Sequence, residues 1–193
     1  MAVTVTALGL TKIEVANIGS DGAPGEYATL GKTYEGTCNM VDEDPTTTEF
    51  YCEEEDEPVV SIAKKGKTTI NWSIMNADAS VMKKIFGGKV TEAVPGTSGA
   101  IWEAPAKMEA KELAVKLTPY IGCTFEIARA SVTAKINGNF GKNDIFLVDM
   151  ILTVLTPIGD RPRIRMTEPT PEAVQQANVS SEEPQGGQSD PVE

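Results

Sequence analysis

Histidine is absent from this chain of 193 residues, and with it the side chain that most often transfers protons in catalysis near neutral pH. Without a histidine base, the many serine and threonine hydroxyls cannot form a conventional catalytic triad. The sequence also contains no phosphate-binding loop motif. We therefore expect a protein with no enzyme activity, no metal site and no cofactor.

Cysteine is scarce: Cys38, Cys52 and Cys123 are odd in number and widely spaced. A disulfide framework needs pairs of cysteines, and a structural zinc site usually contains a close pair such as C-x-x-C. We expect all three cysteines to be buried thiols that pack as small apolar side chains. A zinc site that combines Cys38 and Cys52 with distant partners is the weaker alternative.

Long apolar runs are missing as well. No stretch of about 20 apolar residues is present, so we expect no transmembrane helix and no membrane contact. The first residues, MAVTVTALGLTKIEV, lack the basic region and the apolar stretch of a signal peptide and instead predict a strand. We therefore expect a protein that is made and kept in a cytoplasm.

Basic residues are outnumbered by acidic ones, 17 against 28, which gives a net charge of −11. Such a chain is repelled by nucleic-acid phosphates, so it would meet DNA only as a surface that does not bind it. The segment 167–193 carries six acidic residues, no basic residue and much Pro, Gln, Ser and Gly. We predict a β domain over residues 1–157 and a disordered acidic tail over residues 158–193.

Apolar residues alternate with polar ones along much of residues 2–155, which predicts a mainly β protein. The apolar face of the strand 68–75 is formed by Thr68, Ile70, Trp72 and Ile74. We expect this strand to pair with residues 58–63 as a hairpin around the tight turn 64–67. The nearly continuous apolar run 145–155 predicts a central strand, either buried on both faces or shared between the core and a subunit contact. We assign Val148 and Met150 to a subunit interface as a hypothesis.

One short helix interrupts the strands near residues 77–86. Asp78 is the expected N-cap, and Gly87-Gly88 is the expected stop. Apolar residues recur at helical spacing at Val81, Met82, Ile85 and Phe86. We predict that Trp72, Phe86 and Trp102 are the large anchors of the core.

An acidic segment, residues 41–57, predicts a long loop or hairpin that leaves the body of the domain, and it ends in the acidic run Glu53–Glu57. The basic turn 64–67 is either an ordinary solvated turn or a docking point for the acidic run of a neighbouring subunit. The candidate interface residues in these two segments are Glu53, Glu54, Glu55, Lys64 and Lys65. Divalent cation binding by the acidic residues of 42–44 and 53–57 is a weaker alternative to a solvated loop, because their spacing matches no calcium loop.

Three segments carry a resemblance to a known family. KTTINWSIMNADASVMKKIFGG, residues 67–88, resembles the strand-to-helix signature of the major tail tube proteins of long-tailed phages. ASVTAKINGNFGKNDIFLVDMILTVLTP, residues 130–157, is similar to the closing hairpin of that family. EYATLGKTYEGTCNM, residues 26–40, fits its early strands.

The resemblance implies a two-sheet β-sandwich or barrel flanked by one helix. Six copies would form a ring, and stacked rings would form a tube that conducts DNA. The partners implied are other copies of the chain and further tail proteins, namely the terminator, the tape measure and the baseplate. The protein would reside in the virion tail, and in the host cytoplasm before assembly. A mildly acidic lumen would let DNA slide, and the acidic tail would lie on the outside.

Two other functions remain open. The chain could be the tube component of a contractile or secretion-type injection machine, which shares the fold. It could also be a monomeric β-sandwich binding module, for carbohydrate or a cell surface, although the sequence shows no cluster of exposed aromatic residues.

Overall fold

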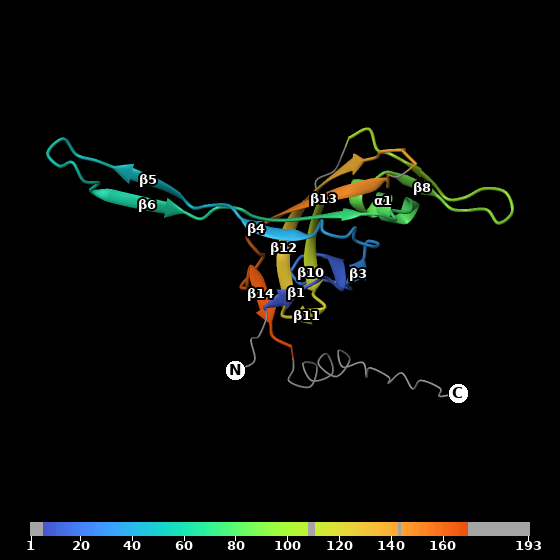
Figure 1. Ribbon diagram of the computed structural model, residues 1–193, viewed down its shortest axis with the longest axis horizontal. Coiled ribbons are helices and arrows are strands. Elements are labelled where there is room, and N and C mark those ends of the chain that lie inside the picture. The colour runs from blue at the N-terminus through green and yellow to red at the C-terminus, as the bar shows by residue number, and fades with distance from the viewer. Residues whose placement is uncertain (1–5, 108–110, 143, 170–193) are drawn as a thin grey trace, which may run out of the picture.

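The computed structural model describes residues 6–107, 111–142 and 144–169. Its main feature is an antiparallel sheet of eight strands, seven of which lie in one continuous order (Figure 1). These seven are β3 (Ala28–Thr29), β2 (Lys12–Asn17), β10 (Lys111–Thr118), β12 (Thr124–Asn137), β13 (Leu147–Val154), β7 (Thr68–Ile74) and β4 (Asn39–Asp42). The eighth strand, β14 (Ile164–Thr167), also pairs with β12.

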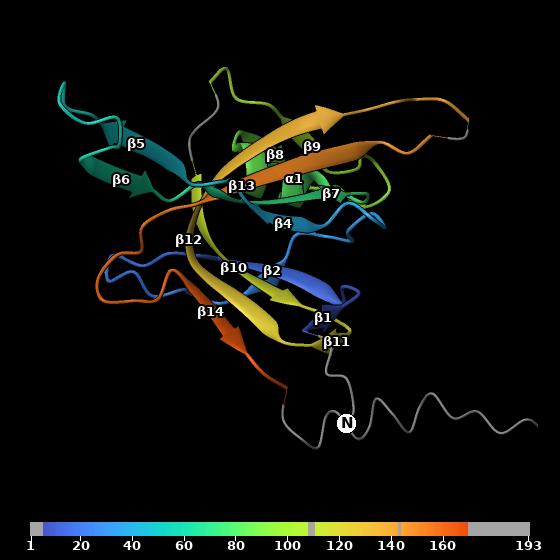
Figure 2. The same ribbon diagram turned by 60° about the vertical axis from the view of Figure 1, so that its left-hand side comes forward.

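The long strand β12, with 14 residues, belongs to both layers of the fold. Its first residues pair with β14 and its last residues pair with β13, while β10 runs along its other side. Figure 2 shows the sheet bending along β12, so that β13, β7 and β4 lie in one layer and β2, β10 and β14 in the other. The strand order ends at β3 and β4 without closing into a barrel. This arrangement confirms the expected mainly β, sandwich-like fold with one short helix.

The core fills the space inside the bend. From one layer it receives alternate residues of β7 and β13, namely Ile70, Trp72, Ile74, Val148, Met150 and Leu152. From the other layer it receives Ile13, Val15, Leu113, Val115, Leu117 and Ile127. Full burial of one such side chain stabilises the folded state by roughly 1.5–3 kcal/mol, so these strands carry most of the stability.

The helix α1 (Ala79–Phe86) packs its apolar side against this core. The carboxylate of Asp78 accepts a hydrogen bond from the Val81 amide at 2.8 Å, which confirms the predicted N-cap. The helix ends at Gly87, which has a positive φ of 78°. Within the described part of the chain, no helix is long and apolar enough to cross a bilayer.

Three two-stranded ribbons complete the fold. They are β1 (Ala7–Leu8) with β11 (Ile121–Gly122), β5 (Thr46–Phe50) with β6 (Val60–Lys64), and β8 (Lys89–Thr91) with β9 (Ile101–Glu103). The ribbon β8–β9 brings Trp102 against α1, where the side chain is half-buried. Trp72 and Phe86 are both buried in the core.

The predicted hairpin between residues 58–63 and 68–75 is wrong. β6 pairs with β5, whereas β7 lies between β4 and β13. The reason is that residues 65–67 do not turn the chain back on itself but link the ribbon β5–β6 to the sheet. The extension therefore comprises residues 43–66 and not only the acidic residues 41–57.

The predicted end of the domain at residue 157 also needs correction. β14 pairs with the first half of β12 at four positions, from Thr124↔Thr167 to Ile127↔Ile164, so the sheet continues to residue 167. The run RPRIRM, residues 161–166, alternates arginine with apolar residues, but it is short and contains a proline, which is why the sequence did not predict this strand. Residues 170–193, the larger part of the predicted tail, lie outside the described residues.

Candidate assembly surface

The most prominent surface feature is the extension formed by β5 and β6, which we call the long hairpin (residues 43–66). Figure 1 shows it projecting from the body as a continuation of β4 and β7. At its root the Glu43 amide donates a hydrogen bond to the Lys67 carbonyl at 2.8 Å. Gly66 lies directly against the Glu43 carbonyl, at a place where a Cβ atom would collide with backbone. The root of the hairpin thus depends on the close approach of residue 66 to the Glu43 carbonyl, which only glycine allows.

The long hairpin has one apolar face and one polar face. In its register Phe50 lies opposite Val60, and Thr48 lies opposite Ile62, so these side chains share one face. Glu49 and Ser61 form a pair on the other face. The apolar face is open to solvent, with Phe50 53%, Val60 48% and Ile62 56% exposed. A two-stranded ribbon with an uncovered apolar face is marginally stable in water, so covering this face would stabilise the ribbon.

The tip of the long hairpin (residues 51–59) is acidic. It carries the five consecutive acidic residues Glu53–Glu57, and all of them are exposed. Among the described residues, no ion pair involves these carboxylates. Beside them the Tyr51 hydroxyl donates a hydrogen bond to the Glu49 carboxylate at 2.7 Å, which raises the pKa of Tyr51. The tip therefore presents uncompensated negative charge.

The candidate interface lysines lie at the opposite end of the ribbon. Lys64 pairs with Thr46 near the root, and the Lys65 ammonium lies 3.9 Å from the Asp42 carboxylate. The structure therefore does not bring Lys64 and Lys65 near the acidic tip of the same chain. Glu53, Glu54 and Glu55 remain available to another molecule.

Val148 and Met150 cannot serve as interface side chains. Both point into the core, where they are 0% and 1% exposed. β13 alternates strictly, and its outward positions are Asp149 and Ile151. The nearly continuous apolar sequence hid this alternation, because Ile151 on the outer face is itself apolar.

The outer face of β4, β7, β13 and β12 is polar and mostly uncharged. Ser73 donates a hydrogen bond to Asp149 at 2.7 Å, and Asn137 donates another to the same carboxylate at 3.0 Å. The Lys135 ammonium lies 3.6 Å from Asp149 and balances its charge. On the next row, Asn71 donates to Asn39 at 3.0 Å. Most of this face consists of amide and hydroxyl groups, with Val41 and Ile151 as exposed apolar side chains among them.

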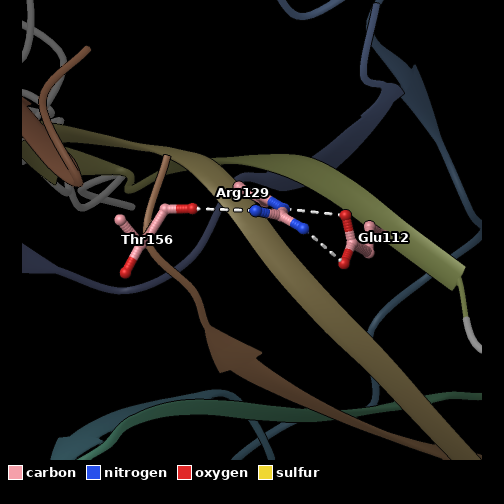
Figure 3. A network of polar contacts seen from close by, with 3 residues as sticks. All are labelled: Glu112, Arg129 and Thr156. Atoms are coloured by element: carbon pink, nitrogen blue, oxygen red, sulfur yellow. Dashed lines mark hydrogen bonds and ion pairs between the residues drawn. The ribbon is translucent and has the colours of Figure 1, made fainter. Parts of the chain in front are cut away.

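A second polar network joins three segments and is shown in Figure 3. The Arg129 guanidinium makes two parallel bonds to the Glu112 carboxylate, at 2.7 and 2.8 Å, and donates a third to the Thr156 carbonyl at 3.1 Å. The hydrogen bond from Arg129 lowers the pKa of Glu112. The charges of Arg129 and Glu112 compensate each other, and both side chains are partly exposed. Through these three hydrogen bonds the network ties β10, β12 and the chain after β13 together.

The cysteines differ from the expected pattern at one position. Cys123 is buried and Cys38 is half-buried, and burial raises the pKa of the Cys38 thiol. Cys52 is exposed within the tip of the long hairpin, so the expectation that all three are buried is wrong for this residue. In the described ranges, no group of three or more His, Cys, Asp or Glu side chains has a metal-binding arrangement.

Sequence analysis missed the apolar face of the long hairpin. The signal was present, because Thr48 and Phe50, and likewise Val60 and Ile62, are separated by one residue in extended segments. The alternation covers only two positions on each strand, and one of them, Thr48, is polar. In comparisons with known proteins, no family model matches this chain, and no curated protein matches it closely enough to count as a relative.

Proposed function

We propose that this chain is a structural protein that assembles with copies of itself into rings, and that stacked rings form the tail tube of a long-tailed phage. The observation that carries the proposal is the long hairpin, which projects from the body with an uncovered apolar face. Burying that face on another copy removes apolar area from water, which is the main driving force of association. The hairpin is then an arm that joins neighbouring copies.

The open sheet supports the same proposal. β4 lies at one end of the strand order and pairs with β7 alone among the described strands, and all four of its residues are exposed. An unpaired strand edge favours pairing with another chain. A contact between two different surfaces of identical copies closes into a ring when the rotation between copies is suitable.

The outer face of β4, β7, β13 and β12 suits the wall of a channel. Its amide and hydroxyl groups offer DNA no cluster of positive charge, and the exposed apolar side chains among them are Val41 and Ile151. Phosphate groups need clustered Lys and Arg for tight binding, so DNA would pass this face without being held. In this proposal the lining is therefore nearly neutral, where the sequence alone suggested an acidic one.

The test is to follow the assembly state of the purified full chain as its concentration is raised, by light scattering after size exclusion and by negative-stain electron microscopy. We expect rings or tubes of uniform width. The variant Phe50→Ser/Ile62→Ser removes the apolar face and should raise the concentration needed for assembly by about tenfold or more.

The matched control is Thr47→Ser/Ser61→Ala, which changes the polar face of the same ribbon and should assemble like the wild type. A wild-type chain that remains monomeric at every concentration, with and without crowding agents, would contradict the proposal. That result would favour the monomeric binding module. A tube built by the wild type alone would not distinguish a phage tail from an injection machine.

A further inference from the structure

Three arginines lie in β14 and in the residues just before it, namely Arg161, Arg163 and Arg165. Arg161 and Arg165, together with Tyr27 and Pro162, line a small depression of about 70 Å³. Arg163 points elsewhere and donates a hydrogen bond to the Thr68 hydroxyl at 2.9 Å. We call the depression between Arg161 and Arg165 the arginine notch.

The acidic groups around the arginine notch leave positive charge in excess. Glu126 lines the notch, but the Lys116 ammonium lies 3.2 Å from its carboxylate and balances it. Asp21 lies 3.9 Å from the Arg161 guanidinium, and both of these side chains are exposed to solvent. Arg165 takes part in no ion pair among the described residues. The notch therefore has an excess of one positive charge, carried by Arg165, on a chain whose net charge is −11.

The size and chemistry of the notch fit a carboxylate side chain. A volume of about 70 Å³ is roughly twice the space of one water molecule in the liquid, which suits a carboxylate and not a folded segment. Two guanidinium groups can each present paired N–H donors to carboxylate oxygens. The strongest source of free carboxylates in the described residues is the tip of the long hairpin, Glu53–Glu57.

The tip cannot enter the notch of its own chain. In Figures 1 and 2 the long hairpin extends away from the body, while β14 lies on the body below the root of the hairpin. The occupant must therefore be the tip of a second copy. Because the tip and the notch are different surfaces, the contact is head-to-tail and can repeat from copy to copy.

We propose that the acidic tip of the long hairpin of one copy docks in the arginine notch of another. This inference rests on the proposed self-assembly and names the surface that receives the hairpin. The apolar face supplies the attraction, and the charges supply the orientation and the register. Like charges at a mismatched contact repel, so the same pair of surfaces also discourages wrong packing between two tips or two notches.

Charge reversal tests the pairing directly. The variants Arg161→Glu/Arg165→Glu and Glu53→Lys/Glu54→Lys/Glu55→Lys/Glu57→Lys should each raise the concentration needed for assembly by about tenfold, because each reverses the net charge of one surface and places like charges together. A single chain that carries both sets of changes restores opposite charges and should assemble as the wild type does. An equimolar mixture of the two separate variants should also assemble, with the two chains alternating.

The matched control is Lys83→Glu/Lys84→Glu, which makes the same change of net charge on α1 and should leave assembly unaltered. Sedimentation velocity at several protein and salt concentrations measures the effect, and salt should weaken the wild-type contact. If the wild type assembles and the arginine variant assembles equally well, this inference fails while the proposed function stands.

Two further results would overturn the inference. Failure of the chain with both the reversed tip and the reversed notch to recover assembly would exclude the pairing of tip and notch. Recovery of the arginine variant by Glu182→Lys/Glu183→Lys instead would assign the notch to the C-terminal segment of the chain. A wild type that never assembles would overturn this inference and the proposed function together.

Discussion

The rings of Phe86 and Trp102 pack against each other with their centroids 5.8 Å apart and their planes inclined at 44°. The Trp102 indole also donates a hydrogen bond to the Gly87 carbonyl at 2.9 Å. One residue from the ribbon β8–β9 thus covers the last turn of α1 and satisfies a carbonyl that the helix leaves without a partner.

Trp102→Ala should lower the free energy of unfolding by about 2 kcal/mol, because it removes both the aromatic contact and the hydrogen bond from a half-buried site. Trp102→Phe keeps a ring and loses the indole donor, so the expected cost is about 1 kcal/mol. Urea unfolding followed by circular dichroism measures both. Equal costs for the two variants would show that the hydrogen bond alone matters.

Asp78→Ala should lower the free energy of unfolding by about 1 kcal/mol, because it removes the N-cap of α1. The hydrogen bond from the Val81 amide, with a smaller contribution from Ser80, lowers the pKa of Asp78. A carboxyl whose pKa is lower in the folded state stabilises the protein above its unfolded pKa, and this contribution is lost as the pH falls through the folded value. Asp78→Asn keeps a good cap without a titrating group, so its stability should depend less on pH below about 4. Denaturant titrations at pH 7 and pH 3 provide the comparison.

Arg129→Lys should lower the melting temperature at pH 7, because an ammonium group cannot make two parallel bonds to Glu112 and a third to the Thr156 carbonyl. Arg129 lowers the pKa of Glu112, so the ion pair contributes at neutral pH and is lost as the pH falls through the folded pKa of Glu112. The gap in melting temperature between variant and wild type should therefore narrow at pH 3. A constant gap across this range would assign the effect to packing of the arginine stem.

Gly66→Ala should disturb the root of the long hairpin, since its new Cβ would collide with the Glu43 carbonyl. We expect weaker assembly with little loss of core stability, because the root lies outside the core. Gly99→Ala is the control, since no atom lies within 4 Å of the position that its Cβ would take. Assembly assays and urea unfolding of both variants separate the two effects.

The sequence predicted those elements whose signal is local. The alternation of residues 68–75 and the spacing of Val81, Met82, Ile85 and Phe86 each mark one face of one element. Asp78 and Gly87 mark the two ends of the helix. Such patterns are read within a few residues, and they were sufficient to predict the mainly β class and the short helix.

Pairing between distant strands could not be read in the same way. The choice of β5 and not β7 as the partner of β6 depends on the place of β7 between β4 and β13, and thus on contacts across some 80 residues. β14 joins the sheet only because the bend in β12 presents a free edge to it. The arginine notch forms from the same long-range pairing, so the sequence showed its arginines but not the surface that they line.

The long hairpin leaves the sheet in line with its strands, since β4 leads into β5 and β6 leads into β7. Tension applied along the hairpin is therefore transmitted to β7, whose six residue pairs with β13 follow one another along the direction of the pull, with their hydrogen bonds perpendicular to it. Hydrogen bonds loaded in shear share the force, whereas bonds peeled from an edge break one after another. The chain thus anchors its exposed arm in a strand pair whose inward side chains are almost fully buried, so a pull on the arm is borne by many hydrogen bonds at once.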